Sequence, residues 1–157
     1  MPSKKKIKFL ALDIDGVLTD GGMYYTESGD EFKKFNTKDG MGIKQAIKKG
    51  IVVGFISSGK NSNIINNRAK LLGVKYVYVG QDEKLDVLKS WCEKLKISLS
   101  EVAYVGDDIN DLQIISAVGF SASPADAVDK VKKEVNVVLK KNGGDACVRE
   151  FIDKYIL

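Results

Sequence analysis

Two patterns of apolar and polar positions alternate along the chain, one typical of buried strands and the other of helices. Their alternation predicts a repeated strand-helix order. Short continuous runs rich in Val, Ile and Leu are typical of strands buried on both faces, and stretches with apolar residues every three or four positions predict helices. The runs predict strands at 7–12, 51–56, 74–79, 102–105, 118–121 and 135–139. The longer stretches predict helices at about 39–49, 61–72, 82–95, 108–116, 125–132 and 145–156.

Strands that alternate with helices predict parallel pairing with right-handed crossovers. The expected fold is α/β, a three-layer sandwich around a mainly parallel, Rossmann-like sheet. One segment departs from the alternation of strands and helices. Two short aromatic-rich runs, at 23–26 and 32–35, flank a turn that contains Gly29. That pattern predicts a small β-hairpin insertion at about 22–35.

Length and composition predict one soluble domain over residues 1–157. With 44% hydrophobic and 29% charged residues, the chain has the composition of a globular protein. No apolar run approaches the ~20 residues that a membrane span needs. Residues 1–8 form a basic lead without a signal-peptide core, so the expected location is the cytoplasm. Cys92 and Cys147 fall in expected helices and are interpreted as packing residues.

Charge and the absence of histidine exclude several classes of function. The net charge of +4 is modest and the lysines are interleaved with acids, which argues against a nucleic-acid surface. Without histidine there can be no Ser-His-Asp triad, no Cys-His catalytic pair and no imidazole metal ligand. Catalysis would have to use carboxylates, lysines, hydroxyls and an oxygen-bound metal.

Polar residues follow the expected strands where each of them ends. Asp13 and Asp15 follow the first strand, Ser58 the second and Asp107 the fourth, while Lys84 comes shortly after the third. Carboxyl ends of parallel strands meet at one edge of the sheet, so these side chains are expected to converge on one cleft. In an extended chain residues i and i+2 point the same way, which would bring the first two carboxylates together. On its own, however, Asp-x-Asp-Gly is equally typical of a simple turn.

The converging groups suit phosphoryl transfer. Asp13, Asp15 and Asp107 offer the hard oxygen ligands that Mg²⁺ prefers, and Lys84 and Ser58 can bind phosphate oxygens. In this interpretation Asp13 attacks phosphorus to form an aspartyl-phosphate. Asp15 protonates the leaving alkoxide and then takes a proton from the attacking water.

The order of these segments resembles the four motifs of the haloacid dehalogenase superfamily of phosphohydrolases. They are DIDGVLTDGG at 13–22, the strand that ends at Ser58, Lys84, and GDDIND at 106–111. Nearly the whole chain is similar to the family of 3-deoxy-D-manno-octulosonate 8-phosphate phosphatases. The further matching segments are FNTKDGMGIK at 35–44, SGK at 58–60, Arg68, AYVGDDIND at 103–111 and GGDACVRE at 143–150.

The resemblance implies a magnesium-dependent enzyme of lipopolysaccharide biosynthesis that removes the phosphate from a 2-keto-3-deoxy sugar acid phosphate. It also implies a capless homotetramer, in which a neighbour's hairpin and C-terminal tail shape the open active site. The residues it places around the substrate or its phosphate are Asp15, Asn36, Thr37, Lys38, Asp39, Gly40, Lys44, Lys60, Arg68 and Lys84. For Lys44 and Arg68 an ordinary solvated helix face is the alternative.

Three departures from the family pattern leave the substrate open. Lys60 stands where members often have Arg, which removes bidentate geometry, and Asn66 and Asn67 replace an arginine-rich run. The usual GGxGAxRE tail reads GGDACVRE at 143–150. A nine-carbon sugar acid 9-phosphate is therefore an alternative substrate to the eight-carbon one. A non-catalytic oligomerisation module is the alternative of another class, although the intact acidic and lysine motifs argue against it.

Overall fold

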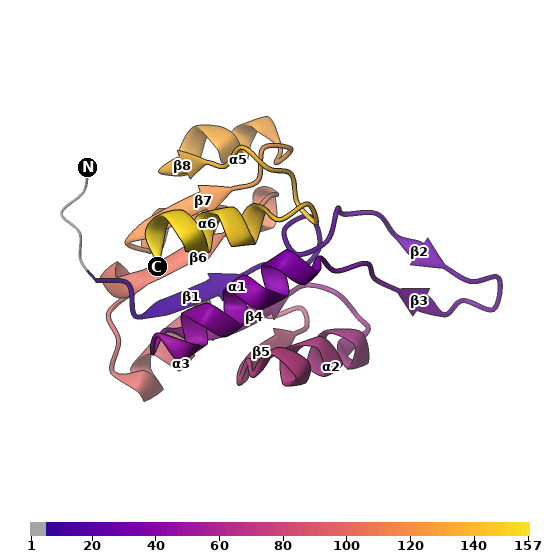
Figure 1. Cartoon of the computed structure of the whole chain (residues 1–157), viewed down its shortest axis with the longest axis horizontal. Coiled ribbons are helices and arrows are strands. Elements are labelled where there is room, and N and C mark those ends of the chain that lie inside the picture. Colours follow the sequence, from indigo (N-terminus) through magenta and orange to yellow (C-terminus); the bar gives the residue numbers. More distant parts are fainter. Residues whose placement is uncertain (1–5) are drawn as a thin grey trace.

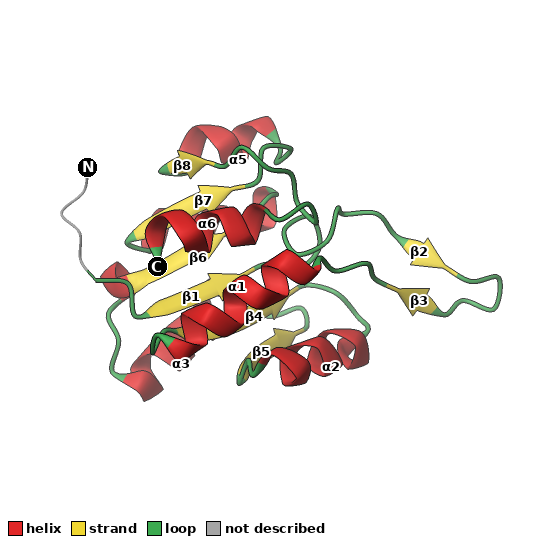
Figure 2. Ribbon diagram, in the orientation of Figure 1, coloured by secondary structure: helices red, strands yellow, loops and turns green. Residues whose placement is uncertain are grey.

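Six parallel strands form one sheet with helices on both of its faces, in a computed structural model that describes residues 6–157 (Figure 1, Figure 2). The strands of this sheet are β1 (Phe9–Leu12), β4 (Val52–Ser57), β5 (Tyr76–Val79), β6 (Val102–Val105), β7 (Phe120–Ser123) and β8 (Val137–Val138). The helices are α1 (Thr37–Lys48), α2 (Ser62–Leu72), α3 (Lys84–Leu95), α4 (Leu112–Ala117), α5 (Asp129–Glu134) and α6 (Cys147–Tyr155). The expected α/β sandwich is confirmed, while residues 1–5 of the basic lead lie outside the described part.

The strand order β5-β4-β1-β6-β7-β8 places β1 at the centre of the sheet. Alternate side chains of β1 enter two separate cores, Leu10 and Leu12 on one face and Phe9 and Ala11 on the other. Helices α1, α2 and α6 contribute to the first core, and α3, α4 and α5 to the second. Burial on both faces explains why these strands read as unbroken apolar runs.

The neighbours of β1 decide where the candidate site lies. Its last residue, Leu12, pairs with Phe55 of β4 and with Val105 of β6. The residues that follow β1, β4 and β6 therefore emerge side by side at one edge of the sheet. The N-terminus of α1 lies at the same edge, since the hairpin returns the chain there (Figure 1).

The expected hairpin is present as an antiparallel pair of two-residue strands, β2 (Tyr24–Tyr25) and β3 (Glu31–Phe32). It projects from the edge of the sheet that carries the β1 loop (Figure 2). Tyr24 pairs with Phe32, and their rings stack with centroids 5.1 Å apart. The regular strands are shorter than the runs at 23–26 and 32–35 predicted.

Several boundaries expected after residue 107 were wrong. The helix expected at 108–116 is a 3-10 turn, η2 (Ile109–Asp111), followed by α4, because the carboxylates of Asp108 and Asp111 cap backbone N–H groups and tighten the first turn. The helix expected at 125–132 begins only at Asp129, after a turn in which Ala127 N–H bonds to the Pro124 carbonyl. The strand expected at 118–121 is shifted to β7, and that expected at 135–139 is reduced to β8.

Cys92 and Cys147 are free and buried in α3 and α6, as expected for packing residues, and burial raises the pKa of both thiols. Within the described residues, no helix combines the length and apolar character that a bilayer crossing requires.

Candidate active site

Asp13 is the first residue after β1, and the sheet itself holds it in place. Its backbone N–H donates to the Val105 carbonyl of β6 at 3.1 Å, which extends the ladder by one residue. The side chain is buried at 6% exposure, and its Oδ1 lies 3.0 Å from Lys84 Nζ at the start of α3. The structure thus brings together two of the expected catalytic residues.

The loop after Asp13 passes close to Asp107, and glycine permits this approach. Gly16 has φ +86°, and a Cβ there would overlap the Asp107 carboxylate. The Thr19 hydroxyl closes the loop by accepting from the N–H groups of Gly16 and Gly21, both at 3.2 Å. The Asp-Gly turn and the catalytic interpretation, which the sequence left as alternatives, are therefore compatible.

Asp111 is the residue that sequence reasoning missed. Its Oδ1 accepts from Lys84 Nζ at 2.8 Å and from the Tyr104 hydroxyl, and its Oδ2 accepts from the N–H groups of Asp107 and Asp108. It is fully buried and so fixes both the lysine and the loop after β6. The spacing of Asp108 and Asp111 is that of a capping box, the one local signal that pointed to this carboxylate.

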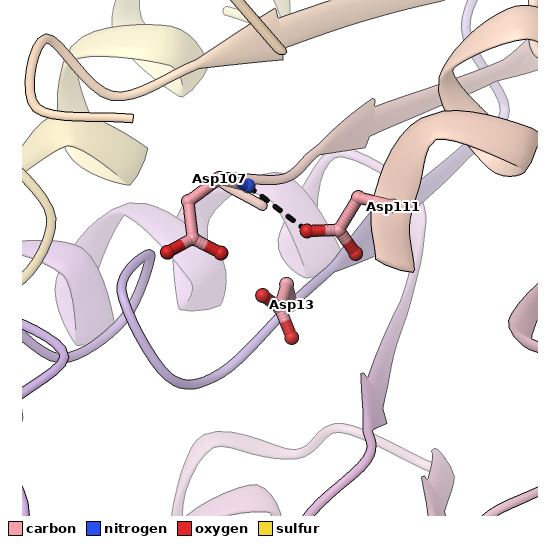
Figure 3. A group of neighbouring side chains, drawn as sticks. All are labelled: Asp13, Asp107 and Asp111. Atoms are coloured by element: carbon pink, nitrogen blue, oxygen red, sulfur yellow. Dashed lines mark hydrogen bonds between the residues drawn. The ribbon is translucent and has the colours of Figure 1, made fainter. Parts of the chain in front are cut away.

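Asp13, Asp107 and Asp111 form an acidic cluster in which ligand oxygens lie within 4.8 Å of one another (Figure 3). The Asp15 carboxylate, which was expected to share the metal, is not among the three. Burial raises the pKa of Asp13 well above its ordinary value, and repulsion from Asp111 adds to the shift. Burial likewise raises the pKa of Asp107 to about 6.

Lys84 is the ammonium that faces this cluster. Burial opposes its charge, but the attraction of Asp13 and Asp111 outweighs that effect and raises its pKa. Lys84 binds two of the three clustered carboxylates, so the cluster has more carboxyl groups than this one cation can neutralise. Clustered carboxylates with too little positive charge, in a chain without histidine, fit a hard divalent cation such as Mg²⁺.

Asp15 lies at the mouth of the site but faces a different partner. The chain turns directly after Asp13, because the Ile14 carbonyl accepts from three backbone N–H groups at 17–19. The extended geometry assumed for residues i and i+2 is therefore wrong. The Asp15 carboxylate, 35% exposed, instead accepts from Lys33 Nζ of the hairpin at 2.6 Å.

Ser58 follows β4 as expected and is exposed at the same edge. Its hydroxyl accepts from Asn110 Nδ2 at 3.2 Å, so the loops after β4 and β6 are in direct contact. Its carbonyl accepts from Gln81 Nε2 at 2.8 Å. Lys60, two residues further, is exposed.

The segment at 36–40 begins α1, and its side chains point in different directions. Asn36 caps the helix, since its Oδ1 accepts from Lys38 N–H, and its Nδ2 donates to the Gly144 carbonyl. Thr37 and Lys38 are exposed. Asp39 is buried at 1% exposure between α1 and α6, where Oδ1 accepts from Arg149 N–H. Burial raises its pKa to about 6. The hydrogen bond to Arg149 joins two helices, and Asp39 is not part of the acidic cluster.

Gly40, Lys44 and Arg68 are likewise not brought to the acidic cluster. A Cβ on Gly40 would meet Arg68 Nη2, so the glycine makes room for the guanidinium. Arg68 donates to the Asn36 carbonyl at 3.4 Å and lies 5.3 Å from the centroid of the Phe35 ring. It thereby holds the segment that leads into α1, while Lys44 is exposed on that helix.

A hollow of about 520 Å³ lies beside the start of α1. Its lining residues are Asp20, Lys34, Phe35, Asn36, Thr37, Asp126, Asn142, Gly143, Gly144 and Asp145. Two expected substrate residues therefore share a concave surface with the glycine-rich segment at 143–145. The acidic cluster lies outside it.

Comparison with known proteins assigns the family. Residues 76–152 match the model of the haloacid dehalogenase-like hydrolases. The chain is 38% identical, over 100% of its own length and 83% of the relative's, to the 3-deoxy-D-manno-octulosonate 8-phosphate phosphatase KdsC of Escherichia coli strain B / BL21-DE3.

Solved structures of similar proteins support the same family assignment. The phosphatase of the same name from Yersinia pestis superposes with a TM-score of 0.91 at 35% identity, covering 94% of this chain and 79% of that one. The Moraxella catarrhalis enzyme, solved in complex with a magnesium ion, a phosphate ion and a KDO molecule, gives 0.90 at 35% identity, with 94% and 84% covered. The chain therefore belongs to the 3-deoxy-D-manno-octulosonate 8-phosphate phosphatase family of haloacid dehalogenase-like hydrolases, and it is a phosphoric monoester hydrolase.

Proposed function

We propose that this enzyme hydrolyses 3-deoxy-D-manno-octulosonate 8-phosphate with the aid of Mg²⁺. The observation that carries the proposal is the Asp13–Lys84 pair, 3.0 Å apart, beside the carboxylates of Asp107 and Asp111. The family membership and the magnesium and KDO bound to the Moraxella relative support it. When bound at the acidic cluster, Mg²⁺ would offset negative charge on the phosphate and on the carboxylates.

Asp13 is the nucleophile in this proposal. One of its oxygens forms a bond to phosphorus while the bond between phosphorus and the sugar oxygen breaks, which leaves an aspartyl-phosphate. Lys84 faces that carboxylate and would also bind a phosphate oxygen, so it holds the two reacting groups together. Asp111 keeps the lysine in position.

Asp15 moves the protons. It gives a proton to the departing sugar oxygen and afterwards takes one from the water that attacks phosphorus. The second attack breaks the bond between phosphorus and the Asp13 oxygen, releases phosphate and restores both carboxyl groups. The Asp15 carboxylate is 35% exposed and pairs with Lys33 of the hairpin, so it is accessible to a leaving group.

The substrate carries two acidic groups, so it needs cations in addition to Lys84. A 2-keto-3-deoxy sugar acid phosphate carries a carboxylate as well as a phosphate, and Lys60, Lys44 and Arg68 are the cations that the family resemblance assigns to it. The nine-carbon acid remains the second candidate, because Lys60 replaces a bidentate group. The non-catalytic alternative is not retained, since the chain belongs to a family of hydrolases.

A steady-state screen tests the substrate. With saturating Mg²⁺, we expect kcat/KM to be highest for the eight-carbon acid phosphate and about 10-fold or more lower for the nine-carbon acid phosphate. Hexose phosphates, which lack the carboxylate, should be poorer still. Equal kcat/KM values for all three would instead indicate a general phosphatase.

We propose further that the chain forms a single phosphatase domain and assembles as a homotetramer through its hairpin. Met23, Tyr25 and Phe32 are 57%, 57% and 52% exposed there, an apolar surface that a second copy would cover. Sedimentation at micromolar concentration should give the tetramer, and Phe32→Glu should shift it to smaller species. A wild-type protein that sediments only as a monomer would contradict this assembly.

A further inference from the structure

Lys33 forms a contact that neither the motifs nor the family resemblance assigned. It follows β3 in the hairpin, and its Nζ lies 2.6 Å from Asp15 Oδ1 and 2.9 Å from Glu31 Oε1. The lysine side chain is only 6% exposed. The other oxygen of Glu31 accepts from Asn61 Nδ2, just before α2. A continuous chain of four polar side chains thus connects the loop after β4, the hairpin and the loop after β1.

The two inner members of this chain are each restricted from two sides. Glu31 is held by Asn61 and Lys33, and Lys33 is held by Glu31 and Asp15. Burying a lysine is unfavourable unless its charge is paired, so the ammonium fixes its acidic neighbours as firmly as they fix it. Burial opposes the charge on Lys33, but the bonds to Asp15 and Glu31 outweigh it and raise its pKa.

The direction of the Asp15 side chain is the consequence that bears on catalysis. A second ammonium, that of Lys84, donates to Asp13 and Asp111. Lys33 instead binds the Asp15 carboxylate from the hairpin side, where Asp15 is 35% exposed. Asp13 and Asp15 are only two residues apart, yet each binds a different lysine. The two carboxylates can therefore serve different steps of the reaction.

We propose that Lys33 is the positioning residue that orients Asp15 toward the leaving group. The inference rests on the proposed function, because it needs Asp15 as the proton donor. A misplaced carboxyl group would slow proton transfer to the sugar oxygen, while attack by Asp13 and binding of the phosphate would remain. Losing the orientation of a catalytic group costs about 10²-fold in rate.

Lys33→Met tests this role through the leaving group. With the sugar acid phosphate, whose alkoxide needs a proton to depart, kcat/KM should fall by about 10- to 100-fold, which is part of the roughly 10²- to 10⁴-fold that general acid catalysis supplies. With an aryl phosphate such as p-nitrophenyl phosphate, whose leaving group departs as a stable anion, it should fall by less than about 3-fold. Equal losses with the two substrates would overturn the proposal.

A double-mutant cycle separates orientation from a merely structural role. In an Asp15→Asn background, Lys33→Met should reduce kcat/KM little further, because residues that act through one another are not additive. Lys33→Arg, which keeps a cation, should recover most of the activity toward the sugar acid phosphate. Lys75→Met, a charge-matched change of an exposed residue just before β5 at the opposite edge of the sheet, should leave both activities unchanged. Additive losses, or no recovery with arginine in a variant that melts like wild type, would contradict the assignment.

The proposed function can fail separately from this inference. If wild type does not turn over the eight-carbon or nine-carbon acid phosphate, the substrate is wrong. If wild type is active but Asp15→Asn shows no dependence on the leaving group, the acid assignment of Asp15 is wrong, and the inference falls with it. If only Lys33→Met lacks that dependence, Lys33 alone is misassigned.

Discussion

Asp13→Asn should reduce turnover of the sugar acid phosphate by about 10⁴-fold or more while the protein remains folded. The amide is not nucleophilic, so the first displacement on phosphorus has no attacking group. Folding should not suffer, because the substitution removes one of two buried carboxylates that share a single ammonium. Thermal unfolding followed by circular dichroism should give a melting temperature equal to or above that of wild type.

The covalent intermediate offers a direct test of the same residue. Rapid quenching during turnover, followed by borohydride reduction, should convert the phosphorylated aspartate to homoserine, and peptide mass spectrometry should locate it at position 13. With an aryl phosphate, whose leaving group needs no proton, Asp15→Asn slows only the attack of water and should increase the amount trapped. Turnover of Asp13→Asn near the wild-type rate, or trapping at another residue, would show that a different group attacks phosphorus.

The gathering of Asp13, Lys84 and Asp107 could be predicted from sequence because it depends on topology alone. Buried runs identify the strands, parallel strands end at one edge, and polar residues at those ends must lie near one another. No detail of side-chain packing enters that argument. The same reasoning located Ser58 at this edge, and the structure places it there in contact with Asn110.

Contacts between residues far apart in sequence set the limit of that reasoning. Lys33 reaches Asp15 only because the chain returns from the projecting hairpin past the loop after β1, and no local pattern encodes that approach. Asp39 resembles an exposed acid in the first turn of a helix, yet the packing of α6 against α1 buries it. The turn at Ile14 likewise depends on three backbone hydrogen bonds, which could not be predicted from the residue types.

Loss of Lys84 should produce the largest combined effect on stability and activity. Lys84→Met leaves Asp13 and Asp111 buried without their shared cation, and removing one partner of a buried ion pair costs about 3–5 kcal/mol in the free energy of unfolding. Loss of a cation that faces the reacting phosphate should also lower kcat by about 10²- to 10³-fold. Urea denaturation at two pH values measures the first effect, and steady-state kinetics the second.

The sign of the pH dependence follows from the carboxyl groups. The pKa of Asp13 is already raised in the folded protein, chiefly by burial, and Lys84 is the group that lowers it. Without the lysine it should rise further. A carboxyl group whose pKa is higher in the folded than in the unfolded state stabilises the fold at low pH, and this contribution is lost as pH rises through the folded value. The deficit of Lys84→Met should therefore be larger near pH 8 than near pH 5.

Two variants show whether the instability of Lys84→Met comes from uncompensated charge or from a general loss of packing. Adding Asp111→Asn to Lys84→Met should restore part of the stability near pH 8, because it removes one of the buried charges left without a partner, and activity should stay low. Lys8→Met breaks an ion pair of 2.8 Å with Glu101, but at 50% side-chain exposure it should cost less than about 1 kcal/mol. The outcome that contradicts this account is a Lys84→Met deficit that is no larger than that of Lys8→Met or that does not grow with pH. Charge compensation by Lys84 would then not explain how Asp13 and Asp111 can both be buried.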